Sequence, residues 1–524
     1  MSEAARAARE WGIAVALAAS FAFTGLANHA LQVPDEPRVA GIAWEMQHTG
    51  QWVPHLAGVP FLEHPPLYYA VLGAFIRGFG ATDGVARLPS AIASLLTALL
   101  VFSLARRAAD RSAGFPALLA LIGIAGFFGH SHRAVVDPLL MLFAMCGYYA
   151  YARAAFLDSE RAARWLCVVY ASAALAFWTK GPVGVVAIAG PVGLDALLAR
   201  RWGALRSPVH WIALPLLLAA CAAWPIALYL ASGEQTASTF LLNNVLYRIA
   251  PGVGTGHYLG GHDRPFWYYP TRFLGQLGWT IVLVPAVAAW LWRGKAPSGW
   301  RMPALRFLAW VFPIGMLLLS IPGTKRALYL LPFEPPLAVA IGAWIAAAGR
   351  ADAGRTRIEA IVNALCARIA RVDLASAASG ACRAPYRVAA LAFAIAIAWN
   401  AIGLRFVDRD RELAPMVRAV GARVGAEPLL VFRPSESLIG AFPFYTGRIP
   451  LQSHRLAELE RQLARSDARF LLAPLSLRDA IAAELGTGAA LEKTFTADND
   501  DYALFALSPA VATSQDPPSH LMPN

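Results

Sequence analysis

The chain has 524 residues, of which 57% are hydrophobic and only 15% are charged. Soluble domains carry roughly 25% charged residues, so a chain this long and this apolar is expected to be a polytopic membrane protein rather than one water-soluble core. The net charge of +12 would indicate nucleic-acid binding in a soluble protein. Here the arginines lie between apolar runs, as the positive-inside rule describes, so we expect membrane lipids and no nucleic acid as partners.

Apolar runs long enough to cross a bilayer recur through the first part of the chain. A spanning helix needs roughly 20 apolar residues. About eleven runs approach that length, and because sequence patterns place helix ends loosely the range is about 10 to 13. They lie at residues 11–31, 87–105, 113–130, 134–155, 164–180, 182–199, 208–231, 273–292, 304–322, 328–348 and 387–404. The sequence therefore predicts an α-helical polytopic membrane domain over residues 1–404.

The arginines are distributed unevenly over the loops between these runs. With the N-terminus inside, the inner loops hold most of them, at residues 106–111, 153–164, 200–206, 293–306 and 350–387, whereas the outer loops hold fewer. This asymmetry predicts a cytoplasmic N-terminus, and an odd number of spans then puts the C-terminus outside. The inner loop 349–386, rich in Ala and Arg, is expected to form amphipathic helices on the cytoplasmic surface.

Residues 32–86 form a predicted outer loop that is too long for a simple connector. It contains two segments that look helical, "PRVAGIAWEMQHTG" from Pro37 and "LYYAVLGAFIRGFG" after Pro66, because proline favours the first turn of a helix. The acids Asp35 and Glu36 precede the first segment, where they suit the positive end of the helix dipole. A helix cap is one interpretation of this pair, and a functional role is the other.

The chain beyond residue 404 has a different sequence pattern. Its segments "PLLVFR", "ARFLLAP" and "DYALFAL" are typical of strands, and "RELAPMVRAVGARVG", "HRLAELERQLARS" and "LRDAIAAELG" are typical of helices between them. This alternation predicts a small soluble α/β domain at 405–510. Its segment "AFPFYTGRIP" is expected to be a turn at a strand edge, with a surface that faces the acceptor as the alternative. Residues 511–524 are rich in Pro and Ser and are expected to be disordered.

Charged side chains stand at the predicted outer ends of several spans. Asp137 interrupts the apolar stretch "AVVDPLLMLF", and Lys180 and Lys325 are two of only four lysines in the chain. An ionisable residue within a membrane span is a functional hypothesis by default, although a single cation there can also be a side chain that reaches the interface. Because acids and cations gather on one face of the predicted bundle, we expect a functional site on that face.

This combination suits the transfer of a sugar from a lipid-linked phosphate. Cations bind phosphate, and a carboxylate removes a proton from an attacking hydroxyl or stabilises positive charge at a sugar carbon. Glu63 and a distant histidine are candidates for holding a divalent metal, which their spacing leaves open. The glycines of "PGVGTGHYLGGH" match neither the dinucleotide nor the P-loop pattern, so no nucleotide cofactor is expected.

Several motifs resemble those of one family and occur in the same order. They are "DEPRVAGIAWEM", "GQWVPHLAGVPFLEHPPLYYA", "ARLPSAIASLL", "FWTKGPVG", "HDRPFWYYP" and "GTKRALYLLPFEPPLAV". They resemble family 39 and the aminoarabinose-transferase group of C-type glycosyltransferases. The C-terminal domain resembles this group only loosely. The resemblance implies the C-type glycosyltransferase fold and a bacterial inner-membrane enzyme. It also implies transfer of a sugar, with inversion, from polyprenyl (undecaprenyl) phosphate on the periplasmic face.

The resemblance also implies roles for individual residues. Asp35 is the implied catalytic carboxylate, with Arg38 beside it, and Asp137 is a second acidic site residue. Glu63 and His262 correspond to positions that hold a divalent metal, such as Zn, Mg or Mn. The residues expected to bind substrate are Arg38, His64, Tyr68, Lys180, Arg248, Lys325, Arg326 and Tyr329.

One residue departs from the family pattern. The box that usually reads Glu-Lys-Pro-Pro has His64 in place of the lysine, and a histidine is only partly charged near neutral pH. This difference bears on lipid A as the acceptor more than on glycosyl transfer itself. A lipid A-type or other periplasmic acceptor is expected, with protein O-mannosylation as an alternative. A transporter of lipid-linked sugars and a non-catalytic membrane assembly protein are alternatives of other classes.

Overall fold

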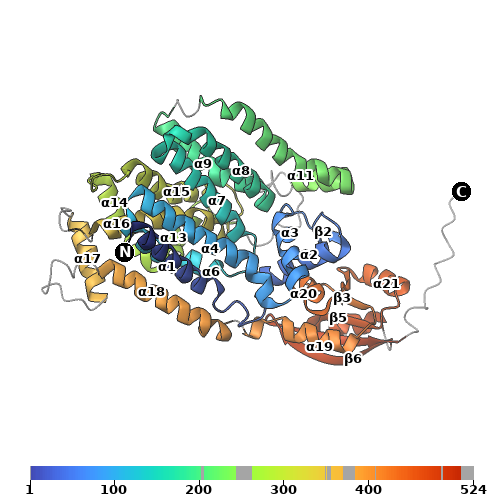
Figure 1. The fold of residues 1–524 in the computed structure, drawn as a ribbon. Helices are drawn as coiled ribbons and strands as arrows, with labels where there is room; N and C mark the ends of the chain where they lie inside the picture. Colours follow the sequence, from blue (N-terminus) through green and yellow to red (C-terminus); the bar gives the residue numbers. More distant parts are fainter. Residues whose placement is uncertain are drawn as a thin grey trace. The chain divides into compact units, whose positions relative to one another are not determined.

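Each apolar run predicted from the sequence contains helix in the computed structural model, which describes residues 2–201, 206–242, 263–348, 350, 356–369, 384–407, 409–485 and 488–508 (Figure 1). The run predicted at 11–31 is helical only as far as Phe23. The chain divides into two compact units. The first comprises residues 1–26, 62–68 and 87–403 and contains the membrane helices. The second comprises residues 27–61, 69–86 and the chain from Leu404 onward. Most of the outer loop, which we assigned to the membrane domain, therefore clusters with the C-terminal domain.

The first unit is the helical part of a multi-pass membrane protein. Within the described ranges, seven helices are long and apolar enough to cross a bilayer, or eight if the bent pair at Tyr268–Val282 and Val284–Arg293 is one span. The runs predicted at 113–130 and 182–199 form shorter apolar helices. The main elements are α1 (Glu3–Phe23), α4 (Asp83–Ala108), α5 (Gly114–Gly123), α6 (Ala125–His130), α7 (Asp137–Ala152), α8 (Ala162–Lys180), α9 (Pro182–Leu198), α11 (Val209–Thr239), α13 (Tyr268–Leu277), α14 (Val284–Arg293), α15 (Met302–Ser320), η6 (Ala327–Phe333), α16 (Glu334–Ala348), α17 (Arg357–Ile369) and α18 (Ala384–Ala401).

Two of the predicted spans are broken, and a third changes helix type along its length. The run at 113–130 is interrupted at Ile124, between α5 and α6. The run at 273–292 bends by 72° between η5 (Gly278–Val282) and α14. The run at 328–348 begins as the 3-10 helix η6, where Pro332 has no N–H to continue an α-helical ladder. Apolar length alone does not predict such breaks, because it averages over the whole run.

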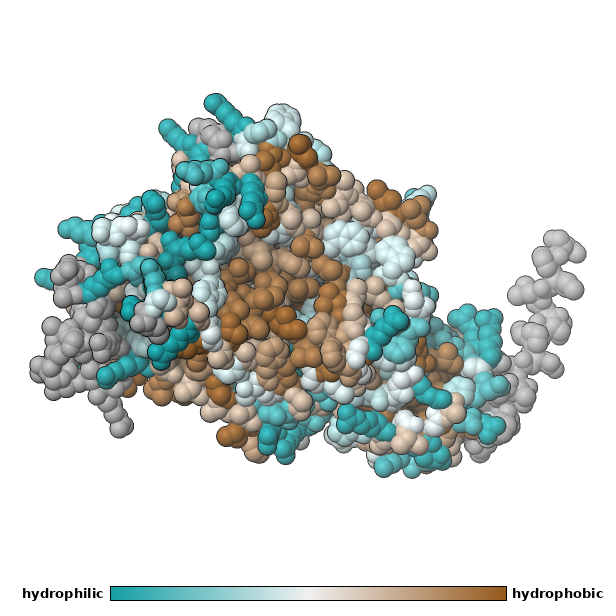
Figure 2. All heavy atoms as spheres, viewed as in Figure 1, coloured by the Kyte–Doolittle hydropathy of each residue, from teal (hydrophilic) through white to brown (hydrophobic). Residues whose placement is uncertain are grey.

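Helix α16 forms the most deeply buried part of the first unit. Nearly all of its residues are buried, and it packs against α5 and α15. By contrast, α11 exposes Trp211, Ile212 and Leu230, as expected for a helix that faces lipid. Figure 2 shows apolar side chains, in brown, over a broad area of this helical unit. The unit therefore combines a protein-filled core with an apolar outer face.

The loop between α16 and α18, which is predicted to lie inside, contains an amphipathic helix, as predicted. Helix α17 exposes Ile358, Ile361 and Leu365, which are three and four residues apart, and it buries Val362 and Cys366. This spacing puts the exposed residues on one stripe of the helix. The predicted helix is confirmed, whereas its place at the cytoplasmic surface stays a prediction.

The C-terminal part of the second unit is the predicted small α/β domain. Its five-stranded sheet has the order β4-β3-β5-β7-β6, with β3 parallel to β4 and β5, and with β7 antiparallel to β5 and β6. The elements are α19 (Ala414–Val424), β3 (Leu429–Phe432), β4 (Leu451–Ser453), α21 (Leu456–Arg465), β5 (Phe470–Pro474), α22 (Arg478–Leu485), β6 (Ala489–Ala497) and β7 (Asp500–Leu507). The predicted disordered tail, 511–524, lies outside the described residues.

One element of this domain differs from the prediction. The segment 441–450, predicted as a turn at a strand edge, contains the second half of helix α20 (Glu436–Thr446). The Ser435 hydroxyl caps this helix by accepting a hydrogen bond from the Leu438 N–H, and Gly447 ends it in the left-handed conformation. Aromatic residues in the segment favour strands. Burial of Phe442 and Phe444 in the packed domain outweighs that preference.

Helix α20 packs closely against α2 (Asp35–Thr49), the first helix of the outer loop. After α2 come the hairpin β1 (His55–Leu56) and β2 (Val59–Pro60), and then α3 (Leu67–Phe79). Gly41 and Gly440 lie at the crossing: a Cβ atom added to Gly41 would lie 2.3 Å from the Gly440 carbonyl oxygen. Because the two backbones touch there, the first turn of α2 lies beside the first turn of α20.

We expect Gly41→Ala to destabilise the protein. The added methyl group meets backbone rather than a flexible side chain, so α2 and α20 must separate, at a cost of about 1–3 kcal/mol in free energy of unfolding. Thermal unfolding of the detergent-solubilised protein measures this loss. Gly12→Ala in α1 is the matched control, because no described atom lies within 4 Å of its added Cβ. Equal unfolding midpoints for the two variants would contradict the close helix contact.

Candidate active site

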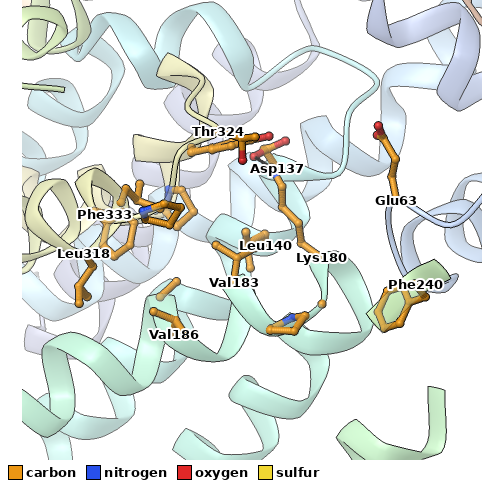
Figure 3. A pocket seen from close by; sticks show the side chains of 17 residues that line it. Glu63, Asp137, Leu140, Lys180, Val183, Val186, Phe240, Leu318, Thr324 and Phe333 are labelled. Carbon is orange, nitrogen blue, oxygen red and sulfur yellow. Dashed lines mark hydrogen bonds and ion pairs between the residues drawn. The ribbon is translucent and has the colours of Figure 1, made fainter. Parts of the chain in front are cut away.

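A pocket in the first unit lies among the ends of α7, α8, α9 and η6 (Figure 3). Its walls are mainly apolar and are formed in part by Leu140, Val183, Val186, Phe240, Leu318 and Phe333. Figure 3 shows the Lys180 side chain extending toward Asp137, with Glu63 on the opposite side from Leu318 and Phe333. The pocket therefore has apolar walls and a charged centre.

Asp137 and Lys180 form a buried ion pair in this pocket. Asp137 begins α7, and Lys180 ends α8, which packs against α7. The Lys180 ammonium donates a hydrogen bond to Asp137 Oδ1, and the two side chains are only 4% and 3% exposed. Gly181 follows with φ of 70°, a conformation that suits glycine and turns the chain directly into α9. Because buried charges are costly unless paired, this pair within apolar walls indicates a functional site.

The short helix η6 supplies an aromatic side chain to the same centre. The Tyr329 ring centroid lies 4.3 Å from Lys180 Nζ, a distance at which a cation–π interaction is favourable. The Tyr269 hydroxyl of α13 donates a hydrogen bond to the Arg326 carbonyl oxygen at 3.2 Å. Contacts from α8 and α13 therefore hold η6 in place, with Tyr329 in the pocket wall.

Lys325, in the loop before η6, binds the main chain. Its ammonium donates hydrogen bonds to the carbonyl oxygens of Arg264, at 2.9 Å, and of Pro322 and Gly323. Burial lowers the pKa of Lys325, whereas the negative charge of Asp263 opposes that shift. Lys325 thus ties the chain after residue 262 to the loop beside the pocket. Its contact with a substrate phosphate stays a prediction.

The predicted "EHPPLYY" box contributes one side chain to the pocket. Glu63 lines the pocket, and His64 is half-buried. Tyr68 is fully buried, and its hydroxyl shares a hydrogen bond with Ser90 Oγ at 2.8 Å. Tyr68 therefore connects the start of α3 to α4. A contact between Tyr68 and substrate stays a prediction.

A divalent metal at Glu63 also stays a prediction. Within the described ranges, no group of three or more His, Cys, Asp or Glu residues could hold a metal ion. The carboxylate of Glu63 is a fitting ligand by type, but its predicted partner His262 lies outside the described residues, as does Arg248. No chemical step is therefore assigned to a metal.

The predicted catalytic carboxylate lies in the second unit, at the first turn of α2. Asp35 is 4% exposed, and its Oδ1 accepts a hydrogen bond from Arg38 Nη2 at 2.9 Å. Arg38 Nη1 donates to Glu436 Oε2 at 2.6 Å. The neighbouring acid behaves differently: Glu36 is fully buried and accepts a hydrogen bond from the Gln32 N–H at 2.7 Å. Glu36 thus bonds the backbone before α2, whereas Asp35 pairs with a cation.

Three polar side chains near these sites are not predicted from the sequence. Glu334, at the start of α16, is fully buried and accepts a hydrogen bond from Gln276 at 2.6 Å. Arg87 in α4 is 1% exposed and donates to a main-chain carbonyl at 2.7 Å. Glu334 interrupts the apolar run at 328–348 and Arg87 begins the run at 87–105, a signal that could have identified them. Glu436 carries no such signal, because it is 398 residues away from Arg38 in the chain.

The chain is similar to known glycosyltransferases. Residues 63–226 match the family model described as dolichyl-phosphate-mannose-protein mannosyltransferase. The undecaprenyl phosphate-alpha-4-amino-4-deoxy-L-arabinose arabinosyl transferase of Aeromonas hydrophila is 30% identical over 409 residues, which are 74% of this chain and 72% of that protein. The protein of the same name from Edwardsiella ictaluri is 31% identical over 352 residues, 65% of this chain and 60% of the relative. The chain thus spans less than two thirds of the Edwardsiella protein.

A solved structure shows the same fold. ArnT from Cupriavidus metallidurans, in a crystal structure bound to undecaprenyl phosphate, superposes with a TM-score of 0.76 at 18% sequence identity, covering 98% of this chain and all of that chain. At this identity the likeness establishes the fold alone, and the predicted C-type architecture is confirmed. The predicted enzyme class agrees with the names of the sequence relatives. With 30% identity to a relative of which it covers 72%, the chain belongs to the undecaprenyl phosphate-alpha-4-amino-4-deoxy-L-arabinose arabinosyl transferase family.

Proposed function

We propose that this protein transfers a sugar from polyprenyl (undecaprenyl) phosphate to a lipid A-type or other periplasmic acceptor, with inversion at the anomeric carbon. The buried Asp137–Lys180 pair beside Tyr329, in a pocket with apolar walls, carries this proposal. Apolar walls suit an isoprenoid chain, and a cation suits the phosphate that joins this chain to the sugar. The names of the sequence relatives, and the undecaprenyl phosphate in the Cupriavidus structure, support the same donor.

The proposed chemistry is a single displacement at the sugar. An acceptor oxygen attacks the anomeric carbon from the face opposite the phosphate, and the bond from that carbon to the phosphate oxygen breaks. The polyprenyl phosphate leaves with the electron pair of that bond, and Lys180 stabilises its charge. A hydroxyl acceptor passes its proton to Asp35. A phosphate acceptor has no proton to lose, and Asp35 then acts by positioning the acceptor and by its charge.

Protein O-mannosylation is the second candidate. The mannosyltransferase model matches residues 63–226, a range that includes Glu63, Asp137 and Lys180. A protein acceptor would present a serine or threonine hydroxyl, which requires a base, and Asp35 fits that need. A transporter of lipid-linked sugars is the candidate of another class, and it requires no group that activates an acceptor.

We place the reaction at the periplasmic face of the bacterial inner membrane. The uneven distribution of arginines predicts a cytoplasmic N-terminus and an outer location for the site and the C-terminal domain. An outer location agrees with an acceptor that is reached from the periplasm. Labelling of single introduced cysteines with a membrane-impermeant reagent in intact spheroplasts tests this orientation.

Transfer of a radiolabelled sugar tests the function. The purified full-length protein in detergent is supplied with undecaprenyl phosphate carrying labelled aminoarabinose or mannose, and with lipid A or a serine-containing peptide. Label in lipid A supports the proposed function, whereas label in the peptide supports the mannosyltransferase. Label that only crosses the bilayer of proteoliposomes indicates a transporter and contradicts both. Loss of transfer on chelation, with recovery on adding Zn, Mg or Mn, would support the predicted metal.

A further inference from the structure

Arg38 connects the candidate catalytic carboxylate, Asp35, to Glu436 of the C-terminal domain. Arg38 Nη2 donates to Asp35 Oδ1 at 2.9 Å, and Arg38 Nη1 donates to Glu436 Oε2 at 2.6 Å. All three residues lie within the second unit. We infer that Glu436 is a positioning residue that holds the Arg38 guanidinium in the orientation Asp35 needs for transfer. This inference rests on the proposed function, since it requires that Asp35 acts in glycosyl transfer.

Contacts at the start of α20 hold Glu436 beside Arg38. The Ser435 hydroxyl caps the helix, so its first turn begins at Glu436. The next residue, Ser437, donates a hydrogen bond from its hydroxyl to the Pro34 carbonyl oxygen at 2.7 Å. One turn further on, Gly440 lies so close to α2 that an added Cβ would be 2.7 Å from the Arg38 Cα atom. The first turns of α2 and α20 are therefore fixed to each other by contacts that directly follow Glu436.

Arg38 needs this second partner because of its shape. The guanidinium is a planar fork with donors on both edges, and its long side chain loses much rotamer freedom when it is fixed. Here Asp35 accepts from one end of the fork, Glu436 accepts from the other, and the Phe61 ring centroid lies 5.5 Å from the guanidinium carbon. Without Glu436, both ends of the fork can turn toward Asp35 and compete with the acceptor for its oxygens.

The Glu436 contact contributes to orientation rather than to stability. The Glu436 side chain is 43% exposed, whereas those of Arg38 and Asp35 are 15% and 6% exposed. Ion pairs with one exposed partner contribute little to the free energy of unfolding, because water and salt screen them. Loss of the Glu436 charge is therefore expected to slow transfer while the protein stays folded, a combination that a purely structural contact does not produce.

Steady-state kinetics of the full-length protein test this inference. We expect Glu436→Gln to lower kcat by roughly tenfold to hundredfold, as for a misplaced catalytic group, with an unchanged KM for the lipid-linked donor and an unchanged Tm. Glu436→Asp keeps the charge and is expected to recover part of the rate. Glu492→Gln is the matched control: Glu492 also pairs with an arginine, Arg423, in the same domain but away from Asp35, and its loss should leave kcat unchanged.

A double-mutant cycle shows whether Glu436 acts through Arg38. In the Arg38→Ala background, Glu436→Gln should cause no further loss of kcat, because the side chain that it orients is absent. An equal loss in both backgrounds, or an unchanged kcat in Glu436→Gln, would overturn the positioning role while the proposed function stands. If the wild-type protein transfers no sugar, both the proposed function and this role are refuted. A lower Tm with kcat unchanged would show that the contact is structural only.

Discussion

Asp35→Asn is expected to lower the rate of sugar transfer to a hydroxyl acceptor by roughly 10²- to 10⁴-fold, the usual contribution of a general base. Asparagine has nearly the same shape but neither carries the negative charge nor accepts the proton. The protein should stay folded, because Arg38 keeps its ion pair with Glu436 and Glu36 keeps its bond to the backbone before α2. The measurement is transfer of radiolabelled sugar by purified protein, with Tm measured on the same sample.

The acceptor changes the size of this effect. With a phosphate acceptor no proton is removed, so the loss in Asp35→Asn should be smaller than with a hydroxyl acceptor. Asp467→Asn, an exposed acid of the C-terminal domain, is the control and should transfer at the wild-type rate. Wild-type transfer by Asp35→Asn would mean that Asp35 only supports the start of α2, and Asp137 and Glu63 would then be the next carboxylates to change.

Lys180→Met is expected to remove transfer and also to destabilise the protein. It leaves the Asp137 carboxylate, whose side chain is 3% exposed, without its cation in an apolar pocket. Breaking a buried pair by removing one partner costs about 3–5 kcal/mol in free energy of unfolding. Thermal unfolding in detergent should show a clearly lower Tm, and the donor phosphate loses a cation that stabilises it as it leaves.

The double variant Asp137→Asn with Lys180→Met separates the two roles of this pair. Removing the unpaired charge should restore most of the lost stability, because neutral side chains in a buried position avoid the desolvation cost. Transfer should remain absent, because the cation is still missing. Recovery of both stability and transfer would show that the pair is structural, and an unchanged Tm in Lys180→Met alone would contradict its burial.

The helical part of the fold could be predicted because its signal is local. Each predicted apolar run contains helix, although the first ends at Phe23 rather than residue 31, and Pro37 and Pro66 mark the two helices of the predicted outer loop to within a few residues. The predicted strands at "PLLVFR", "ARFLLAP" and "DYALFAL" are β3, β5 and β7. The second half of α20 was predicted as a turn at a strand edge. Its aromatic residues are only moderate helix formers, and packing against α2 and α19 stabilises the helix there.

The candidate site could be predicted only in part. Asp137 and Lys180 stand out because an ionisable side chain in an apolar run is costly, and the structure shows that they pair with each other. Lys325 stands out as one of only four lysines, at the predicted outer end of a span, yet it bonds three main-chain carbonyls. The sequence pattern identifies a charge that needs a partner, but it does not say which partner the charge has.

The sequence alone determined that this protein crosses the membrane many times, that its charged groups gather at the ends of its helices, and which family it resembles. These features depend on apolar length, charge and short motifs, which are properties of neighbouring residues. Only the tertiary structure decided that Asp137 pairs with Lys180 and that Glu436 reaches Arg38. It also decided that most of the predicted outer loop clusters with the C-terminal domain. Such contacts join residues far apart in the chain, such as the 398 positions between Arg38 and Glu436, and they arise from side-chain packing that no local pattern records.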